Sequence, residues 1–154
     1  EPLIDPAMIQ AAVAPLLNDQ SIPMGTLRTP LTSLDEFHNP NVVKVVTDRA
    51  GFALYFSRAP IPYPRDFDEQ LEQRWSELAT AKHVGLYVYR RSFLLDYPHL
   101  PKTPLEEQEC LEQLRALEHG YRIHVATTDL VGQGVDTPAD LERVRAMLSS
   151  AAGT

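Results

Sequence analysis

Strict alternation of side chains from Lys82 to Tyr89 is the feature that most constrains the fold. Val84, Leu86 and Val88 fall on one face of an extended chain, because successive side chains of a strand point to opposite sides. The other face carries His83, Gly85, Tyr87 and Tyr89. The pattern predicts a strand with one apolar face toward the core. Its second face suits a polar ligand, but a strand with solvent-facing aromatic side chains fits equally well, and both interpretations stay open.

Helical patterns alternate with strand patterns around this segment. Thr103-Pro104-Leu105-Glu106 is a capping box that predicts a helix ending at Gly120, and residues 121–127 then predict a strand. Another helix is expected from Asp5 to about Leu17, because Asp5 and the proline after it suit a helix start. Alternation of helices and strands predicts an α/β layered fold.

The helix expected between Thr103 and Gly120 has an apolar stripe. Its members are Cys110, Leu111, Leu114 and Leu117. Cys110 is therefore interpreted as core filler rather than as a catalytic thiol. Glu112 falls nearly opposite this stripe, so helical periodicity predicts a solvated side chain.

Two β-rich runs, residues 42–47 and 52–56, flank a turn at residues 48–51. They predict a β-hairpin in which Gly51 supplies the dihedral that other residues rarely adopt. Both runs are apolar enough to be expected in a position buried on two faces. Residues 22–31 are also extended, but prolines interrupt them, so they predict an edge strand at best.

Two further segments connect these elements. The prolines of residues 59–65 predict a stiff extended connector. Residues 69–79 are polar and only loosely periodic, and they predict a surface helix anchored by Trp75 and Leu78.

Composition limits the classes of function. The 154 residues include 14 basic and 21 acidic side chains, a net charge of −7, which argues against a nucleic acid partner. No stretch approaches the length of a membrane span and no signal peptide is visible, so no membrane partner is expected. Cys110 is the only cysteine, which excludes an intrachain disulfide and favours a cytoplasmic location. The opening Glu1-Pro2 indicates a truncated N-terminus.

Asp136 stands between a glycine-rich segment, residues 132–134, and a well-marked helix start. Thr137 suits the cap, Pro138 the first helical position, and Asp140 completes a capping-box pattern. A carboxylate held there could bind a hard cation such as magnesium, which prefers oxygen ligands and keeps positions for phosphate oxygens. A plain helix start is the other interpretation, and on the residues alone it is the commoner one.

Arg58 ends a hydrophobic strand just before the proline-rich connector. Strand ends in α/β proteins commonly meet ligands, and a fixed guanidinium could bind a carboxylate through two parallel hydrogen bonds. A surface ion pair is the alternative interpretation. Nucleophile elbows, zinc-binding spacings, P-loops and dinucleotide fingerprints are absent from the sequence. The remaining histidines are interpreted as structural: His38, His99, His119 and His124.

An ordered set of motifs resembles the 3-deoxy-manno-octulosonate cytidylyltransferases, also called CMP-Kdo synthetases. The motifs are Asn39–Val46, Tyr55–Ala59 with Ile61-Pro62, His83–Arg90, Leu111–Arg115 and Gly134–Pro138. The resemblance covers nearly all of residues 1–154 but is weak between Pro64 and Ala81. Glu1-Pro2 is similar to the end of that family's Gly-Asp-Glu-Pro loop.

The resemblance implies an enzyme of lipopolysaccharide biosynthesis. It would join CTP to the sugar acid Kdo, release pyrophosphate and form CMP-Kdo with magnesium as cofactor. The chain would be the C-terminal part of a single three-layer nucleotide-diphospho-sugar transferase-like domain without its N-terminal nucleotide-binding part. The β-hairpin around residues 48–51 would belong to a smaller lobe through which two copies pair into a homodimer, and the fragment alone would be inactive.

The resemblance also implies roles for single residues. Arg58 would pair the sugar carboxylate, His83 and Tyr87 would bind sugar hydroxyls, and Glu112 with Gln113 would add polar contacts. Asp136 would be the catalytic metal ligand. The role of Glu112 conflicts with its expected position on the solvated side of a helix. Two alternatives remain: a cytidylyltransferase for a related ulosonic acid, such as an amino-substituted Kdo or a capsule-pathway version, and a non-catalytic sugar-acid binding or dimerisation module.

Overall fold

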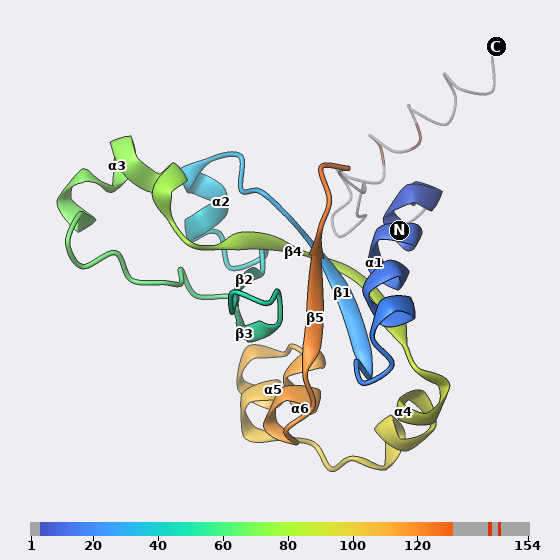
Figure 1. Cartoon of the computed structure of the whole chain (residues 1–154). Helices are drawn as coiled ribbons and strands as arrows, with labels where there is room; N and C mark the ends of the chain where they lie inside the picture. Colours follow the sequence, from blue (N-terminus) through green and yellow to red (C-terminus); the bar gives the residue numbers. More distant parts are fainter. Residues whose placement is uncertain (1–3, 131–141, 143–144, 146–154) are drawn as a thin grey trace.

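The computed structural model describes residues 4–130 together with residues 142 and 145 (Figure 1). Five strands form one sheet: β1 (Met24–Thr29), β2 (Lys44–Thr47), β3 (Ala53–Ser57), β4 (Ala81–Tyr89) and β5 (Ile123–Thr127). The helices are α1 (Pro6–Asn18), α2 (Leu34–His38), α3 (Leu71–Arg74), α4 (Arg91–Asp96), α5 (Pro104–Glu109) and α6 (Gln113–Glu118). Short 3₁₀ turns are η1 (Asp68–Gln70), η2 (Trp75–Glu77) and η3 (Tyr97–His99). No helix in the described part of the chain is long and apolar enough to cross a bilayer.

The strand order is β3-β2-β4-β1-β5, with β1 and β5 parallel and the other pairs antiparallel. Phe52, after the turn between β2 and β3, also bridges to His124 of β5, which shows that the sheet is curled. Gly51 in that turn has a φ of +82°, and its carbonyl accepts from the Val125 amide at 2.8 Å. The hairpin and its glycine are therefore confirmed.

Helices cover both faces of the sheet, which confirms the predicted α/β layered class (Figure 1). On one face, Met8 and Ala12 of α1 pack against Leu27, Val84 and Leu86. The opposite face packs against α4, α5 and α6, and its buried cluster contains Phe56, Phe93, Tyr97, Leu111, Leu114 and Ile123, among others. Val84, Leu86 and Val88 of β4 therefore face α1, whereas Tyr87 and Tyr89 face the other side, as the alternation predicts.

The predicted edge strand at residues 22–31 is wrong, because β1 lies between β4 and β5. Pro23 and Pro30 flank β1 instead of interrupting its hydrogen bonds, so they leave the pairing of Met24–Thr29 intact. The expectation that both hairpin strands are buried on two faces is also wrong. β3 is an edge strand, and Leu54 on it is 64% exposed.

The predicted long helix after Thr103 is broken into α5 and α6. Its predicted start is confirmed: α5 begins at Pro104 after Thr103, and the Glu106 carboxylate accepts from the Thr103 amide at 3.4 Å. The break falls at Cys110, which has a left-handed φ of +51° and is exposed, so its predicted place in the apolar stripe is wrong. The helix predicted at residues 69–79 is a four-residue α3 between two 3₁₀ turns.

Gly25 allows α1 to approach the sheet closely. A methyl group added there would lie 2.8 Å from Leu16 Cδ1, 3.0 Å from Val88 Cγ2 and 3.3 Å from the Ala12 carbonyl oxygen. The last of these is main chain and does not move without α1. The glycine therefore sets the spacing between helix and sheet.

We expect Gly25→Ala to lower the free energy of unfolding by about 1–3 kcal/mol, because the methyl overpacks the contact between α1 and β1. Gly85→Ala is the matched control, since a methyl there meets no atom within 4 Å. Its effect should stay within about 0.5 kcal/mol. Urea unfolding measures both variants, and equal losses in the two would contradict the close-approach argument.

Candidate functional site

His83 and Tyr87 lie on the β4 face that α4–α6 cover. β1 and β4 change register here: Leu27 pairs with Val84 and Thr26 with Tyr87, so Gly85 and Leu86 form a bulge. The fully buried Thr26 hydroxyl lies inside it, 2.8 Å from the Leu86 carbonyl oxygen and 3.1 Å from that of Val84. The Thr26 hydroxyl oxygen also lies 2.9 Å from His83 Nε2.

The His83 ring is enclosed by aromatic rings. Its centroid lies 4.9 Å from that of Phe56 and 5.5 Å from that of Tyr87. Burial disfavours the charged imidazolium and lowers the pKa of His83 to about 4. The imidazole is therefore neutral at physiological pH.

Tyr87 stands next to other phenols. Burial raises the pKa of its hydroxyl, and Tyr89, Tyr97 and the Glu112 carboxylate raise it further. The phenol keeps its proton and remains a hydrogen-bond donor. Its hydroxyl makes no hydrogen bond to the part of the chain that the structure describes.

Glu112 and Gln113 form the start of α6. The Glu112 side chain is exposed, and its main-chain carbonyl accepts from the Tyr97 hydroxyl at 2.7 Å. Gln113 is only 4% exposed, and its amide nitrogen has no hydrogen-bond partner within residues 4–130, 142 and 145. A buried donor without a partner is unfavourable in a finished core, and a polar ligand would satisfy it. The solvated position of Glu112 and a role in binding are thus compatible, because α6 begins at the rim of this face.

Arg58 follows β3, two strands away from His83 in the same part of the sheet. Its Nε donates to the Glu109 carbonyl at 2.7 Å, and its Nη1 donates to the Pro40 carbonyl at 3.0 Å. Nη2 lies 3.5 Å from the Cys110 carbonyl oxygen. These contacts hold the left-handed turn at Cys110, which explains the break between α5 and α6. The alternative interpretation of Arg58 as part of a surface ion pair is wrong, because the guanidinium binds carbonyl groups.

Two charged residues that the sequence interpretation missed hold Arg58 in place: the buried Lys44 and the half-buried Glu109. Lys44 Nζ donates to the carbonyls of Asn39, Val42 and Arg58 at 2.8, 2.6 and 2.7 Å. Glu109 accepts from the Ser57 hydroxyl at 2.6 Å and from the Arg58 amide at 2.8 Å. A lysine inside the apolar run of residues 42–46 was the one available signal.

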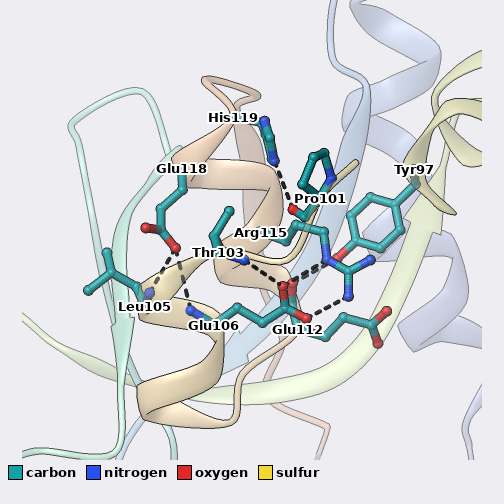
Figure 2. A network of polar contacts seen from close by, with 9 residues as sticks. All are labelled: Tyr97, Pro101, Thr103, Leu105, Glu106, Glu112, Arg115, Glu118 and His119. Atoms are coloured by element: carbon teal, nitrogen blue, oxygen red, sulfur yellow. Dashed lines mark hydrogen bonds and ion pairs between the residues drawn. The ribbon is translucent and has the colours of Figure 1, made fainter. Parts of the chain in front are cut away.

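A polar network joins α5 to α6 next to the start of α6 (Figure 2). Arg115 bridges to Glu106 through two hydrogen bonds of 2.8 and 2.5 Å, and the two side chains are only 12% and 10% exposed. Arg115 also lies over the Tyr97 ring, 5.1 Å from its centroid. The network therefore links α5, α6 and the tyrosine that holds Glu112.

Of the predicted site residues, the structure gathers His83, Tyr87, Glu112 and Gln113 around one face of the sheet and places Arg58 at its edge. Asp136 lies outside the described residues. No group of three or more potential metal ligands occurs among the described residues. A pocket of roughly 360 Å³ lies elsewhere, at the ends of β1, β2 and β5, and none of the predicted residues lines it.

Residues 1–123 match the family model described as Cytidylyltransferase. The chain belongs to the cytidylyltransferase family. It is 62% identical to the 3-deoxy-manno-octulosonate cytidylyltransferase of Syntrophotalea carbinolica over 150 residues. This aligned region covers 96% of this chain and 60% of the relative. The enzyme of that name from Solibacter usitatus is 58% identical over 144 residues, 94% of this chain and 54% of the relative.

A solved structure of CMP:2-keto-3-deoxy-manno-octonic acid synthetase complexed with CTP has the same fold. Its TM-score is 0.85 at 39% identity, over 98% of this chain and 59% of that one. The resemblance to 3-deoxy-manno-octulosonate cytidylyltransferases is therefore confirmed. This member of the family spans about three fifths of the length of the relatives it matches.

We expect Arg115→Met in this cytidylyltransferase chain to lower the free energy of unfolding by about 3–5 kcal/mol, because Glu106 would be left as a buried charge without its partner. Arg74→Met is the matched control. It breaks the Arg74–Glu77 pair, whose side chains are 39% and 53% exposed, and should cost less than about 1 kcal/mol.

The hydrogen bonds from Arg115 lower the pKa of Glu106 below its ordinary 4.5. Their stabilisation is present above pH 4.5 and is lost as the pH falls through the lowered value of the folded state. Urea unfolding at pH 7 and at successively lower pH measures both effects. A loss in Arg115→Met no larger than in the control would contradict the buried-pair interpretation.

Proposed function

We propose that the full-length protein containing this chain is a 3-deoxy-manno-octulosonate cytidylyltransferase that forms CMP-Kdo from CTP and Kdo for lipopolysaccharide biosynthesis. The observation that carries the proposal is the gathering of His83, Tyr87 and Gln113 on one side of the sheet. Each has a hydrogen-bonding atom that no described residue uses. The 62% identity to a protein of that name supports the same activity.

The chemistry of a ulosonic acid fits these groups. Its carboxylate needs a cation, and Arg58 uses three of its five N–H donors on carbonyls, which leaves one N–H on each terminal nitrogen. Its hydroxyls need acceptors and donors, which neutral His83, protonated Tyr87, the Gln113 amide and the Glu112 carboxylate would supply. The site thus binds a polyhydroxylated carboxylic acid.

In the proposed reaction, the anomeric hydroxyl of the bound sugar attacks the α-phosphorus of CTP. A new oxygen–phosphorus bond forms as the hydroxyl loses its proton to solvent. The bond between the α-phosphorus and the oxygen that bridges to the β-phosphate breaks, and pyrophosphate leaves. This chain's residues orient the sugar for that attack, which converts an encounter of two molecules into a reaction within one complex. Asp136 would hold magnesium, whose positive charge offsets the charge on the phosphate oxygens.

In the full-length enzyme, Asp136→Ala should abolish pyrophosphate release from CTP and Kdo, because the metal would lose its carboxylate ligand. Arg58→Ala should chiefly raise the KM for Kdo, by about tenfold or more, because a charge-assisted contact to the carboxylate is removed. Coupled pyrophosphate assays at varied Kdo and magnesium concentrations measure both.

The exposed Arg91 at the start of α4 provides the matched control, and Arg91→Ala should leave turnover unchanged. Full turnover in Asp136→Ala would refute the metal role. Faster turnover of an amino-substituted Kdo than of Kdo would assign the enzyme to a related ulosonic acid. Kdo binding without turnover in the intact wild-type protein would support the non-catalytic module.

We also propose that the full-length protein is a cytoplasmic homodimer that pairs through the lobe formed by β2, β3, α2 and α3. This lobe lies at one end of the sheet, away from α1 (Figure 1). Its β3 is an edge strand that presents the exposed Leu54. Open strand edges with apolar side chains favour pairing with another chain.

Leu54→Glu should shift the full-length protein from dimer to monomer, because the interface would bury an unpaired charge. Leu17→Glu is the control, since Leu17 is 75% exposed on α1, outside the lobe. Sedimentation equilibrium measures the mass of both variants. An unchanged dimer in Leu54→Glu would contradict pairing through this surface.

A further inference from the structure

The Thr26 hydroxyl has three possible hydrogen-bond partners but only one proton to donate. Its oxygen lies within hydrogen-bond distance of the Leu86 carbonyl, the Val84 carbonyl and His83 Nε2. A hydroxyl carries one proton and two lone pairs. Both carbonyl oxygens can only accept, so the single proton must point toward them.

This arrangement decides which nitrogen of His83 carries the proton. If Thr26 donated to Nε2, its oxygen would face two carbonyl oxygens at 2.8 and 3.1 Å with no proton between them. The stable alternative has Thr26 donating into the bulge and Nε2–H of His83 donating to Thr26. Neutral imidazole has only one N–H, so Nδ1 is then a bare acceptor.

We propose that Thr26 is a positioning residue that fixes His83 in the Nε2–H tautomer, so that Nδ1 accepts a hydrogen bond from a sugar hydroxyl. This inference rests on the proposed function for the identity of the ligand, but the tautomer itself does not. Nδ1 makes no hydrogen bond to any residue that the structure describes. Phe56 and Tyr87 enclose the ring, and its burial lowers the pKa of His83 to about 4, so the imidazole stays neutral at pH 7.

With this tautomer, His83 is a hydrogen-bond acceptor and Tyr87 is a hydrogen-bond donor toward the ligand. Nδ1 of His83 accepts a proton that the ligand must supply, while the phenol of Tyr87 keeps a proton that it can donate. Two neighbouring hydroxyls of one sugar satisfy both, since each hydroxyl donates and accepts. A ligand with a hydrogen or a methoxy group opposite His83 would leave Nδ1 without its donor.

The tautomer is tested by nitrogen NMR of the ligand-free full-length protein labelled with ¹⁵N-histidine, with the His83 signals identified by their loss in His83→Gln. We expect a protonated Nε2 and an unprotonated Nδ1 at pH 7. A proton on Nδ1 in the wild-type protein would overturn the proposal without any variant or substrate.

Thr26→Val removes the hydroxyl at nearly constant volume and should convert His83 to a mixture of tautomers. It should also raise the KM for Kdo by the inverse of the fraction of His83 that keeps Nδ1 bare, about twofold for equal populations of the two tautomers, with a smaller change in kcat. Thr26→Ser keeps the hydroxyl and should restore both the tautomer and the KM. Thr29→Val, at a buried threonine on the same strand, is the matched control and should change neither.

An unchanged tautomer in Thr26→Val would overturn the positioning role. In another outcome, the single tautomer is lost in Thr26→Val and restored in Thr26→Ser while the wild-type protein neither binds nor converts Kdo. In that case the proposed function fails but the assignment of the proton stands. A tautomer that follows Thr26 together with an unchanged KM would refute the contact between Nδ1 and the sugar.

Discussion

Pairing between β1 and β4 holds the layers of this molecule together, and it depends on how the bulge at Gly85 and Leu86 is satisfied. A bulge interrupts the ladder of main-chain hydrogen bonds, and buried carbonyls without partners are unfavourable. The Thr26 hydroxyl donates into this bulge and is itself fully buried. Because the bulge inserts two residues, side-chain alternation is preserved along β4. One face can therefore bind α1 while the other carries His83 and Tyr87.

The charged side chains around the site, which are buried or half-buried, bind main-chain groups, hydroxyls or each other. Lys44 and Arg58 donate to main-chain carbonyls, and Glu109 accepts from a main-chain amide and a serine hydroxyl. Arg115 and Glu106 satisfy each other. Such partners offset the cost of removing charges from water and fix the main chain at the ends of β3 and α5. The Gln113 amide nitrogen is an exception, and it lies where the sugar acid is proposed to bind.

Local patterns predicted the elements that depend on near neighbours. The two faces of β4, the hairpin with Gly51, the first helix and the helix start after Thr103 all follow from residues within a few positions of one another. The predictions failed where distant residues decide. Arg58 holds the turn at Cys110 from 52 positions away, so periodicity alone extended one helix through a break. The position of β1 inside the sheet likewise depends on β4 and β5, which lie far along the chain.

The sequence by itself determined the α/β class through local periodicity. Its short motifs indicated the family by resemblance, and that resemblance implied the residues proposed to bind the sugar acid. Only the tertiary structure decided which nitrogen of His83 faces Thr26, what the Arg58 guanidinium contacts, and that the Gln113 amide is buried without a partner. Thr26 and His83 are 57 positions apart. Hydrogen-bond direction depends on every donor and acceptor around an atom, and those neighbours exist only once the chain has folded.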